Sequence, residues 1–165
     1  MTLQTPRFTL TRFQDSDWPF FLHIRQDDSV MRFMSEIASE AQIRTLFSDR
    51  LNNSNAFVVR DAQNNAIGDI GLRPSQHNPQ EADVGYSILP VAQGQGVASE
   101  ALHVLCNFAF EQRDIQALNA WVLAQNQGSV RVLEKSGFTR VQVLEKAYLL
   151  HGEYHDDWIY RREKR

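Results

Sequence analysis

The stretch Leu89–Ser99, which reads LPVAQGQGVAS, constrains the fold more than any other part of the chain. It lies between an apolar run typical of a strand and an apolar run typical of a helix. Gly94 and Gly96 permit a positive φ and a close approach of the backbone to a ligand. The helix that follows would direct its unpaired N–H groups and the positive end of its dipole at the loop. This turn therefore predicts an anion site, with a phosphate as the best candidate.

Two glycines can also do no more than make a tight strand-to-helix turn. The loop contains no Gly-Lys-Ser/Thr, so it is not a P-loop, and its spacing is not that of the dinucleotide-binding glycines. If the loop binds an anion, the ligand that carries the anion is therefore of another kind.

Composition narrows the class of protein. A length of 165 residues predicts a single domain spanning residues 1–165. The net charge of -3 argues against nucleic acid as a partner, and the basic cluster at residues 161–165 is interpreted as a solvated tail. Cys106 is the sole cysteine, which excludes an internal disulfide and favours a reducing compartment. Residues Met1 to Arg12 carry no apolar run like that of a signal peptide, and no apolar run is long enough to span a bilayer, so we expect a cytoplasmic protein with no membrane partner.

Hydrophobic periodicity predicts an α+β (mixed α/β) order of elements. The predicted order is a strand, two helices, three strands, a helix, a strand, a helix and two closing strands. The expected strands cover residues 7–13, 56–60, 66–73, 82–89, 117–123, 138–150 and 154–161. The expected helices begin near residue 15, at Ser39, after the glycine loop and at Asn126, and Gly137 is expected to end the last of them. The two early helices would cover one face of the three-strand meander.

Three segments, in this order and at these distances, carry a resemblance to a known family. The first is Gln93–Ala98 (QGQGVA), and the second is Asn126–Ser129 (NQGS) followed by Val132–Phe138 (VLEKSGF). The third is the opening TPRFTL at residues 5–10, together with IGDIG at 67–71 and DVGY at 83–86. With these segments the chain resembles the GCN5-related N-acetyltransferase (GNAT) family, and within it the Rim-type ribosomal-protein branch. The resemblance covers essentially the whole chain.

The resemblance implies the GNAT acyl-CoA acyltransferase fold. In this fold a mostly antiparallel central sheet, flanked by about four helices, splays open at the cofactor cleft and holds acetyl-CoA in the gap. Strands that part leave backbone groups unpaired, and the amide-rich pantetheine arm can satisfy them as an extra strand would. The pyrophosphate of CoA is then the anion that the loop predicts, and no metal is implied.

The resemblance also assigns the residues that bind the cofactor. Ile88 and Leu89 would contact pantetheine through their main chain and supply an N–H to the thioester oxygen. Asn126 would bond the amide arm, and Ser129 would face the thiol. Backbone N–H groups would form the pyrophosphate cradle, contributed by Gln93, Gly94, Gln95, Gly96, Val97, Ala98 and Ser99.

Acetyl transfer to an amine needs a neutral amine, a donor to the developing oxyanion and a proton for the departing thiolate. Asp83 is the candidate base, or else an ordinary solvated charge on a strand. Many family members place a tyrosine as general acid where this chain has Leu133. Ser129 is then the nearest hydroxyl that could donate the proton, unless it is an ordinary hydroxyl in the first turn of a helix. Tyr86 and Trp121 are expected to shape the acceptor pocket.

The sequence therefore predicts an acetyl-CoA-dependent N-acetyltransferase that works by direct attack of an amine in a ternary complex. The acceptor is either the N-terminal α-amine of a protein or a small-molecule amine. A non-catalytic acyl-CoA sensor and transfer of a longer acyl group, such as succinyl, stay open as alternatives. His151 and His155 are not expected to bind a metal. The oligomeric state is left open, with a homodimer among the options.

Overall fold

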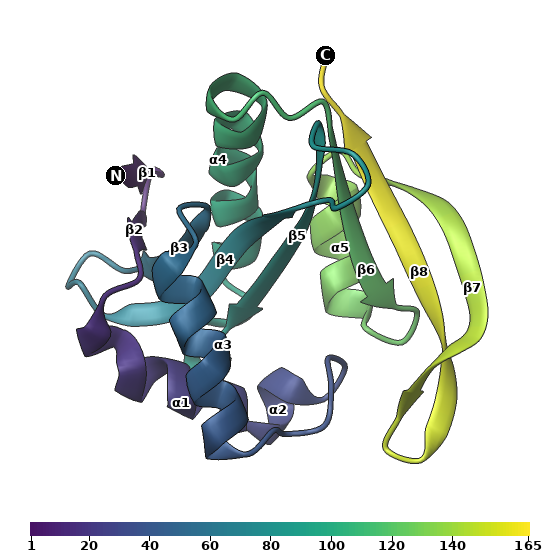
Figure 1. Ribbon diagram of the computed structural model, residues 1–165, viewed down its shortest axis with the longest axis horizontal. Helices are drawn as coiled ribbons and strands as arrows, with labels where there is room; N and C mark the ends of the chain where they lie inside the picture. Colours follow the sequence, from purple (N-terminus) through teal and green to yellow (C-terminus); the bar gives the residue numbers. More distant parts are fainter.

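The computed structural model describes all 165 residues and contains one eight-stranded sheet with the strand order β1-β2-β3-β4-β5-β6-β8-β7 (Figure 1). Each neighbouring pair is antiparallel except β5 and β6, which run parallel. The strands are β1 Thr2–Gln4, β2 Thr9–Arg12, β3 Ala56–Arg60, β4 Ala66–Pro74, β5 Glu81–Ile88, β6 Ala117–Leu123, β7 Thr139–Leu150 and β8 Glu153–Glu163. The helices are α1 Trp18–Gln26, α2 Asp28–Met31, α3 Glu40–Asn52, α4 Val97–Gln112 and α5 Gln127–Lys135. This architecture confirms the predicted fold class.

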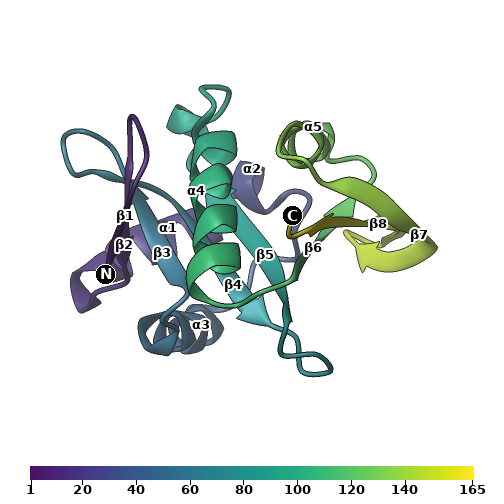
Figure 2. The same ribbon diagram turned by 90° about the horizontal axis from the view of Figure 1, so that it is seen from above.

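Helices cover both faces of the sheet (Figure 2). On one face, α4 and α5 contribute to a core of 28 buried residues, to which the apolar stripe of α4 supplies Ala101, Leu102 and Leu105. On the other face, α1 and α3 pack over β3 around Phe21 and Phe47. The early helices thus cover the meander, as the sequence predicted. On this same face, neither α1 nor α3 extends over the strands that follow β5 in the sheet, which are β6, β8 and β7 (Figure 1).

The strands β5 and β6 separate along their length. They pair only from Glu81 to Asp83 on β5 and from Ala117 to Asn119 on β6, although β5 continues to Ile88 and β6 to Leu123. The remainder of β6 stays paired with β8, so it moves away from β5 together with the β7–β8 hairpin (Figure 1). This divergence is the splay that the resemblance implied.

One strand and one α-helix were not predicted from the sequence. The strand β1 pairs with β2, which begins at Thr9 rather than at Arg7, because Thr5 forms a local turn: its Oγ1 accepts a hydrogen bond from the N–H of Phe8. The four-residue helix α2 is capped by Asp27, whose Oδ1 accepts from the N–H of Ser29 and of Val30. Both devices are polar contacts within three residues, which hydrophobic periodicity does not detect.

Helix ends that depend on side-chain chemistry agree with prediction. The Oγ of Ser39 accepts from the N–H of Gln42 at 3.2 Å and starts α3 in a capping box. Gly137, at φ +86°, follows α5. No helix in the structure has the length and apolar character needed to cross a membrane. No three potential metal-ligating His, Cys, Asp or Glu side chains gather in one place.

Candidate active site

A cavity of about 1060 Å³ occupies the wedge between β5 and β6 and is lined by 30 residues. One end lies between the glycine loop and α5, and we call it the cofactor end. The other end is bounded by residues 29, 30 and 32–34, by Trp121 of β6 and by Tyr148 and Asp157 of the closing hairpin, and we call it the acceptor end. The cavity therefore connects the anion loop with the open part of the sheet.

The backbone N–H groups from Gly94 to Ser99 have no hydrogen-bond partner within the protein. Gly94 and Gly96 adopt positive φ values of 75° and 77°, and Gly96 is the N-cap of α4. The first helical bond of α4 runs from the N–H of Glu100 to the oxygen of Gly96 at 3.0 Å. Consecutive free amides at the positive end of a 16-residue helix form an anion cradle.

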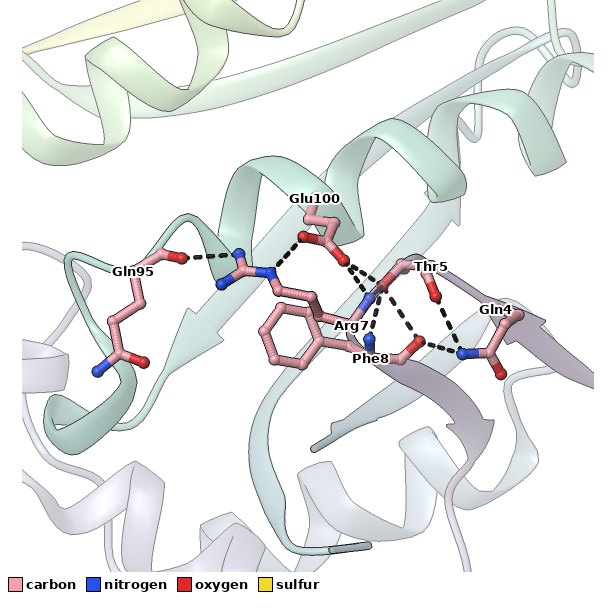
Figure 3. A network of polar contacts seen from close by, with 6 residues as sticks. All are labelled: Gln4, Thr5, Arg7, Phe8, Gln95 and Glu100. Atoms are coloured by element: carbon pink, nitrogen blue, oxygen red, sulfur yellow. Dashed lines mark hydrogen bonds and ion pairs between the residues drawn. The ribbon is translucent and has the colours of Figure 1, made fainter. Parts of the chain in front are cut away.

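A set of polar contacts from the N-terminal segment holds this loop in place, and Figure 3 shows it. Nε of Arg7 donates to Oε1 of Glu100 at 2.8 Å, and Nη2 of Arg7 donates to the backbone oxygen of Gln95 at 2.7 Å. Oε2 of Glu100 also accepts from the N–H of Arg7 and from the hydroxyl of Thr5. We call Thr5, Arg7 and Glu100 the N-terminal clamp. It joins the opening segment, the glycine loop and the first turn of α4.

Replacing Arg7 with alanine is expected to raise the KM for acetyl-CoA about fivefold, with kcat changed less than twofold. The change removes two charge-assisted hydrogen bonds that fix the loop, although the exposure of Arg7 reduces what each contributes. Initial rates at varied acetyl-CoA measure the effect. Arg44→Ala, an exposed arginine of α3 that stacks on Trp18, is the control. An unchanged KM in the Arg7 variant would mean that the loop keeps its shape without the clamp.

The register of β5 decides which backbone groups face the wedge. The N–H of Leu89 donates to the oxygen of Ile67 on β4 at 2.9 Å. Because backbone polar groups alternate in direction along an antiparallel strand, those of Tyr86 and Ile88 point away from β4, toward the gap. This corrects the expectation for Leu89: its N–H is already bonded, and the N–H of Ile88 is the one that faces the wedge. Nε2 of Gln93 donates to the Ile88 oxygen at 3.0 Å and ties the loop to this strand end.

Two hydroxyl groups meet on the wall formed by α5. The hydroxyl of Tyr86 and Oγ of Ser129 lie 2.6 Å apart, and both residues line the cavity. Burial raises the pKa of Tyr86 to about 12, while the hydrogen bond to Ser129 acts in the opposite direction. Leu133, at the position where the family often has a tyrosine, is 1% exposed in the core. The tyrosine hydroxyl at this wall therefore comes from Tyr86 of β5 and not from position 133 of α5, while α5 contributes the hydroxyl of Ser129.

Asn126 has a structural role that the sequence did not predict. Its Oδ1 accepts from the N–H of Ser129 at 3.2 Å and caps α5, while its Nδ2 has no partner within the protein. The cap fixes the first turn of α5, which carries Ser129. Asn126 thus orients the serine and leaves one amide donor for a ligand.

Most of the site residues predicted from the sequence line one cavity. Those that do are Tyr86, Ile88, Gln93, Gly94, Gly96, Val97, Ala98, Ser99, Trp121, Asn126 and Ser129. Leu89 packs instead against Val30 and Met31, and Gln95 presents its carbonyl oxygen to Arg7. Trp121 is 50% exposed at the acceptor end.

Asp83 lies outside the cavity, contrary to the expectation that it borders the acceptor. It occupies the part of β5 that is still paired with β6, opposite Asn119. Burial raises its pKa, an effect that Arg73 partly offsets. The cavity lining on β5 begins one residue further along, at Val84.

The structure adds lining residues that sequence reasoning missed. Arg131 and Lys135 reach the cofactor end from α5; their spacing of four residues on one helix face was a readable signal. Tyr148 and Asp157 reach the acceptor end from β7 and β8. Their position depends on the pairing of a hairpin that carries two register shifts, which sequence does not reveal.

An anion cradle, a parted pair of parallel strands and a cavity that crosses between them form a site for an extended ligand with an anionic group at one end. The chain belongs to the GNAT acetyltransferase family, because the family model described as "Acetyltransferase (GNAT) domain" matches residues 7–139. It is an acetyltransferase that uses acetyl-CoA.

Individual relatives agree in sequence or in fold. The spermidine N(1)-acetyltransferase of Vibrio cholerae is 24% identical over 91% of this chain and 89% of its own. The crystal structure of the Vibrio cholerae spermidine N-acetyltransferase in complex with CoA and spermine superimposes with a TM-score of 0.85 at 22% identity, covering 94% of this chain and 95% of that one. RimL, a ribosomal L7/L12 alpha-N-protein acetyltransferase in complex with CoA, superimposes with a TM-score of 0.84 at 20% identity, covering 99% and 98%. At these identities the structures establish a shared fold.

Proposed function

We propose that this protein transfers the acetyl group of acetyl-CoA to a primary amine by direct attack within a ternary complex. The observation that carries the proposal is the single cavity that joins the free amides of Gly94–Ser99 to the acceptor end. A donor and an acceptor that enter from opposite ends of one wedge can meet without a covalent enzyme intermediate.

The residues present fit acetyl-CoA. The amides from Gly94 to Ser99 would hold its pyrophosphate, and Arg131 and Lys135 would add positive charge from the facing helix. The gap-facing backbone of Tyr86 and Ile88 would pair with pantetheine as a neighbouring strand does. The free Nδ2 of Asn126 would bond an amide of the same arm.

The chemistry assigns roles to the residues near the thioester. The amine nitrogen attacks the carbonyl carbon, the C–N bond forms and the C–S bond breaks. The N–H of Ile88 would stabilise the oxyanion, and the departing thiolate would take a proton from Ser129, which is hydrogen-bonded to Tyr86. The attacking nitrogen loses one proton as the amide forms, and that proton, passed on through water, would restore the hydroxyl pair, so that the net transfer runs from the amine to the CoA thiol. An α-amine with a pKa near 8 is roughly one-tenth neutral at pH 7, whereas a lysine amine is neutral only about once in 2,500. An amine of low pKa therefore needs little help from a base.

We favour a small-molecule amine as the acceptor. The curated Vibrio cholerae relative, named for spermidine, aligns over 91% of this chain. A protein N-terminal α-amine is the second candidate, supported by the fold shared with RimL and by the Rim-type sequence of Asn126–Ser129 followed by Val132–Phe138. Membership of the Rim-type branch is part of that second proposal.

The test is release of the CoA thiol from acetyl-CoA with a panel of diamines, monoamines, amino-acid amides and N-terminal peptides. Turnover with any amine, matched by one acetylated product in mass spectrometry, supports the proposal. Tight CoA binding in calorimetry with no turnover of any amine would instead identify an acyl-CoA sensor. The same amine panel is repeated with succinyl-CoA in place of acetyl-CoA. A kcat/KM that is higher for succinyl-CoA than for acetyl-CoA would identify transfer of a longer acyl group.

A further inference from the structure

Asp157 is the only acidic side chain among the 30 residues that line the cavity. It lies on β8 opposite Leu123 of β6, which is also a lining residue. Its neighbour Trp158 packs against the main core and Tyr160 lies within it, on the side of α4 and α5. Since successive side chains of a strand alternate between faces, Asp157 points to the other face, which is that of the acceptor end.

The carboxylate of Asp157 has neither a hydrogen-bond donor nor an ion-pair partner in the protein. Four other carboxylates of the molecule pair with arginine at 3.0 Å or less: Asp17, Asp69, Glu81 and Glu100. Burial raises the pKa of Asp157, and no neighbouring cation opposes the rise. A partly buried carboxylate that lacks a partner is costly, and it is better explained by a ligand than by packing.

The surroundings of Asp157 suit a cation attached to an apolar chain. Tyr148 of β7 lines the same end, and its hydroxyl is already used because it donates to the backbone oxygen of Met34. Arg32, the basic residue at this end, is exposed and stacks on the ring of Phe33. The exposed ring of Trp121 offers a flat face for methylene groups or for a cation.

We propose that Asp157 is the counter-ion for a positively charged group of the acceptor other than the reacting nitrogen. This inference rests on the proposed amine transfer and adds the class of substrate. The reacting nitrogen must lose its proton before it attacks, and an ion pair with a carboxylate would stabilise the protonated form. A carboxylate at this position therefore serves a second cation. The acceptor class is a diamine, or an amine that carries another fixed positive charge.

The test compares amines that share a carbon chain and differ by one ammonium group: 1,4-diaminobutane with 1-aminobutane, and 1,6-diaminohexane with 1-aminohexane. For one of the pairs, the wild-type kcat/KM is expected to be at least about tenfold higher for the diamine, which corresponds to about 1.4 kcal/mol. In Asp157→Asn the preference falls below about twofold through a higher KM for the diamine. The kcat and the KM for acetyl-CoA stay within about twofold, which a general structural defect would not allow.

Asp156→Asn is the matched control. It makes the same charge change one residue away, on the opposite face of β8, and the asparagine oxygen can still accept from the N–H of Lys146 as Oδ1 of Asp156 does. This variant keeps the diamine preference. A preference that survives in Asp157→Asn, or is absent from the wild type, overturns the inference and leaves amine transfer intact.

Calorimetry of the same amines with CoA-saturated protein separates the two proposals. If the wild type acetylates no amine, the proposed function fails, and binding alone decides the inference. Diamine binding that is lost in Asp157→Asn and retained in Asp156→Asn supports the counter-ion role. Diamine binding that is absent, or equal in both variants, overturns it.

Discussion

Replacing Gly96 with valine is expected to raise the KM for acetyl-CoA roughly 50-fold. Gly96 has a φ of +77°, which for a residue with a side chain costs about 1–3 kcal/mol. A Cβ at this position would also lie 3.2 Å from Nη2 of Arg7, within the N-terminal clamp. The backbone is expected to relax by moving the cradle amides off their target, and about 2.3 kcal/mol of lost binding corresponds to the stated factor. Initial rates at varied acetyl-CoA measure it.

Two further glycine variants separate strain from displacement of the cradle. Gly152, at the turn of the β7–β8 hairpin, has a φ of +80° and open space around its Cβ position. Gly152→Val is therefore expected to lower the melting temperature and leave the KM for acetyl-CoA unchanged. Gly94→Ala, with a φ of +75° and no atom within 4 Å, tests strain within the loop alone and gives an intermediate KM. A Gly96→Val protein that folds and keeps the wild-type KM would contradict the anion cradle.

The cradle could be predicted from the sequence because its chemistry is local. A positive φ requires glycine, and the free amides follow from the start of a helix within the next three residues. The same holds for α5, whose ends are marked by Asn126 and Gly137. The N-terminal clamp differs, because Arg7 is 88 residues from Gln95 and 93 from Glu100 in sequence. Its members are ordinary polar residues until the fold brings them together.

The alternating direction of backbone groups along a strand explains why the expectation for Leu89 was wrong. Sequence reasoning placed both Ile88 and Leu89 at the thioester, yet neighbouring residues of a strand present their backbone groups in opposite directions. Only the register with Ile67 on β4 shows that Ile88 faces the gap. The position of Asp83 outside the cavity depends on where β5 and β6 part, which is a property of the sheet that no local pattern encodes. Asp157 was not singled out from the sequence, because its place at the cavity depends on the pairing of β8 with β6.

Replacing Ser129 with alanine is expected to lower kcat about 100-fold and to leave the KM for acetyl-CoA within about threefold. A positioned proton donor raises the rate by a factor of about 10²–10⁴. At the position where many family members have a tyrosine as general acid, this chain has the buried Leu133, so Ser129 is the proton donor that α5 offers. The control is Ser136→Ala, a hydroxyl at the other end of α5 that donates to the Val132 oxygen at 2.7 Å. Single-turnover measurements at saturating acetyl-CoA separate the chemical step from product release.

Tyr86 determines whether the serine acts alone. Its hydroxyl lies 2.6 Å from Oγ of Ser129, so Tyr86→Phe is expected to lower kcat about tenfold by removing the group that orients the serine and replaces its proton. In Ser129→Ala the tyrosine has no partner through which to act, so the double variant should be no slower than Ser129→Ala. Multiplicative losses in the double variant would mean that the two hydroxyls act independently. Full activity in Ser129→Ala would mean that water protonates the thiolate, and that the hydroxyl pair only shapes the wall of the cavity.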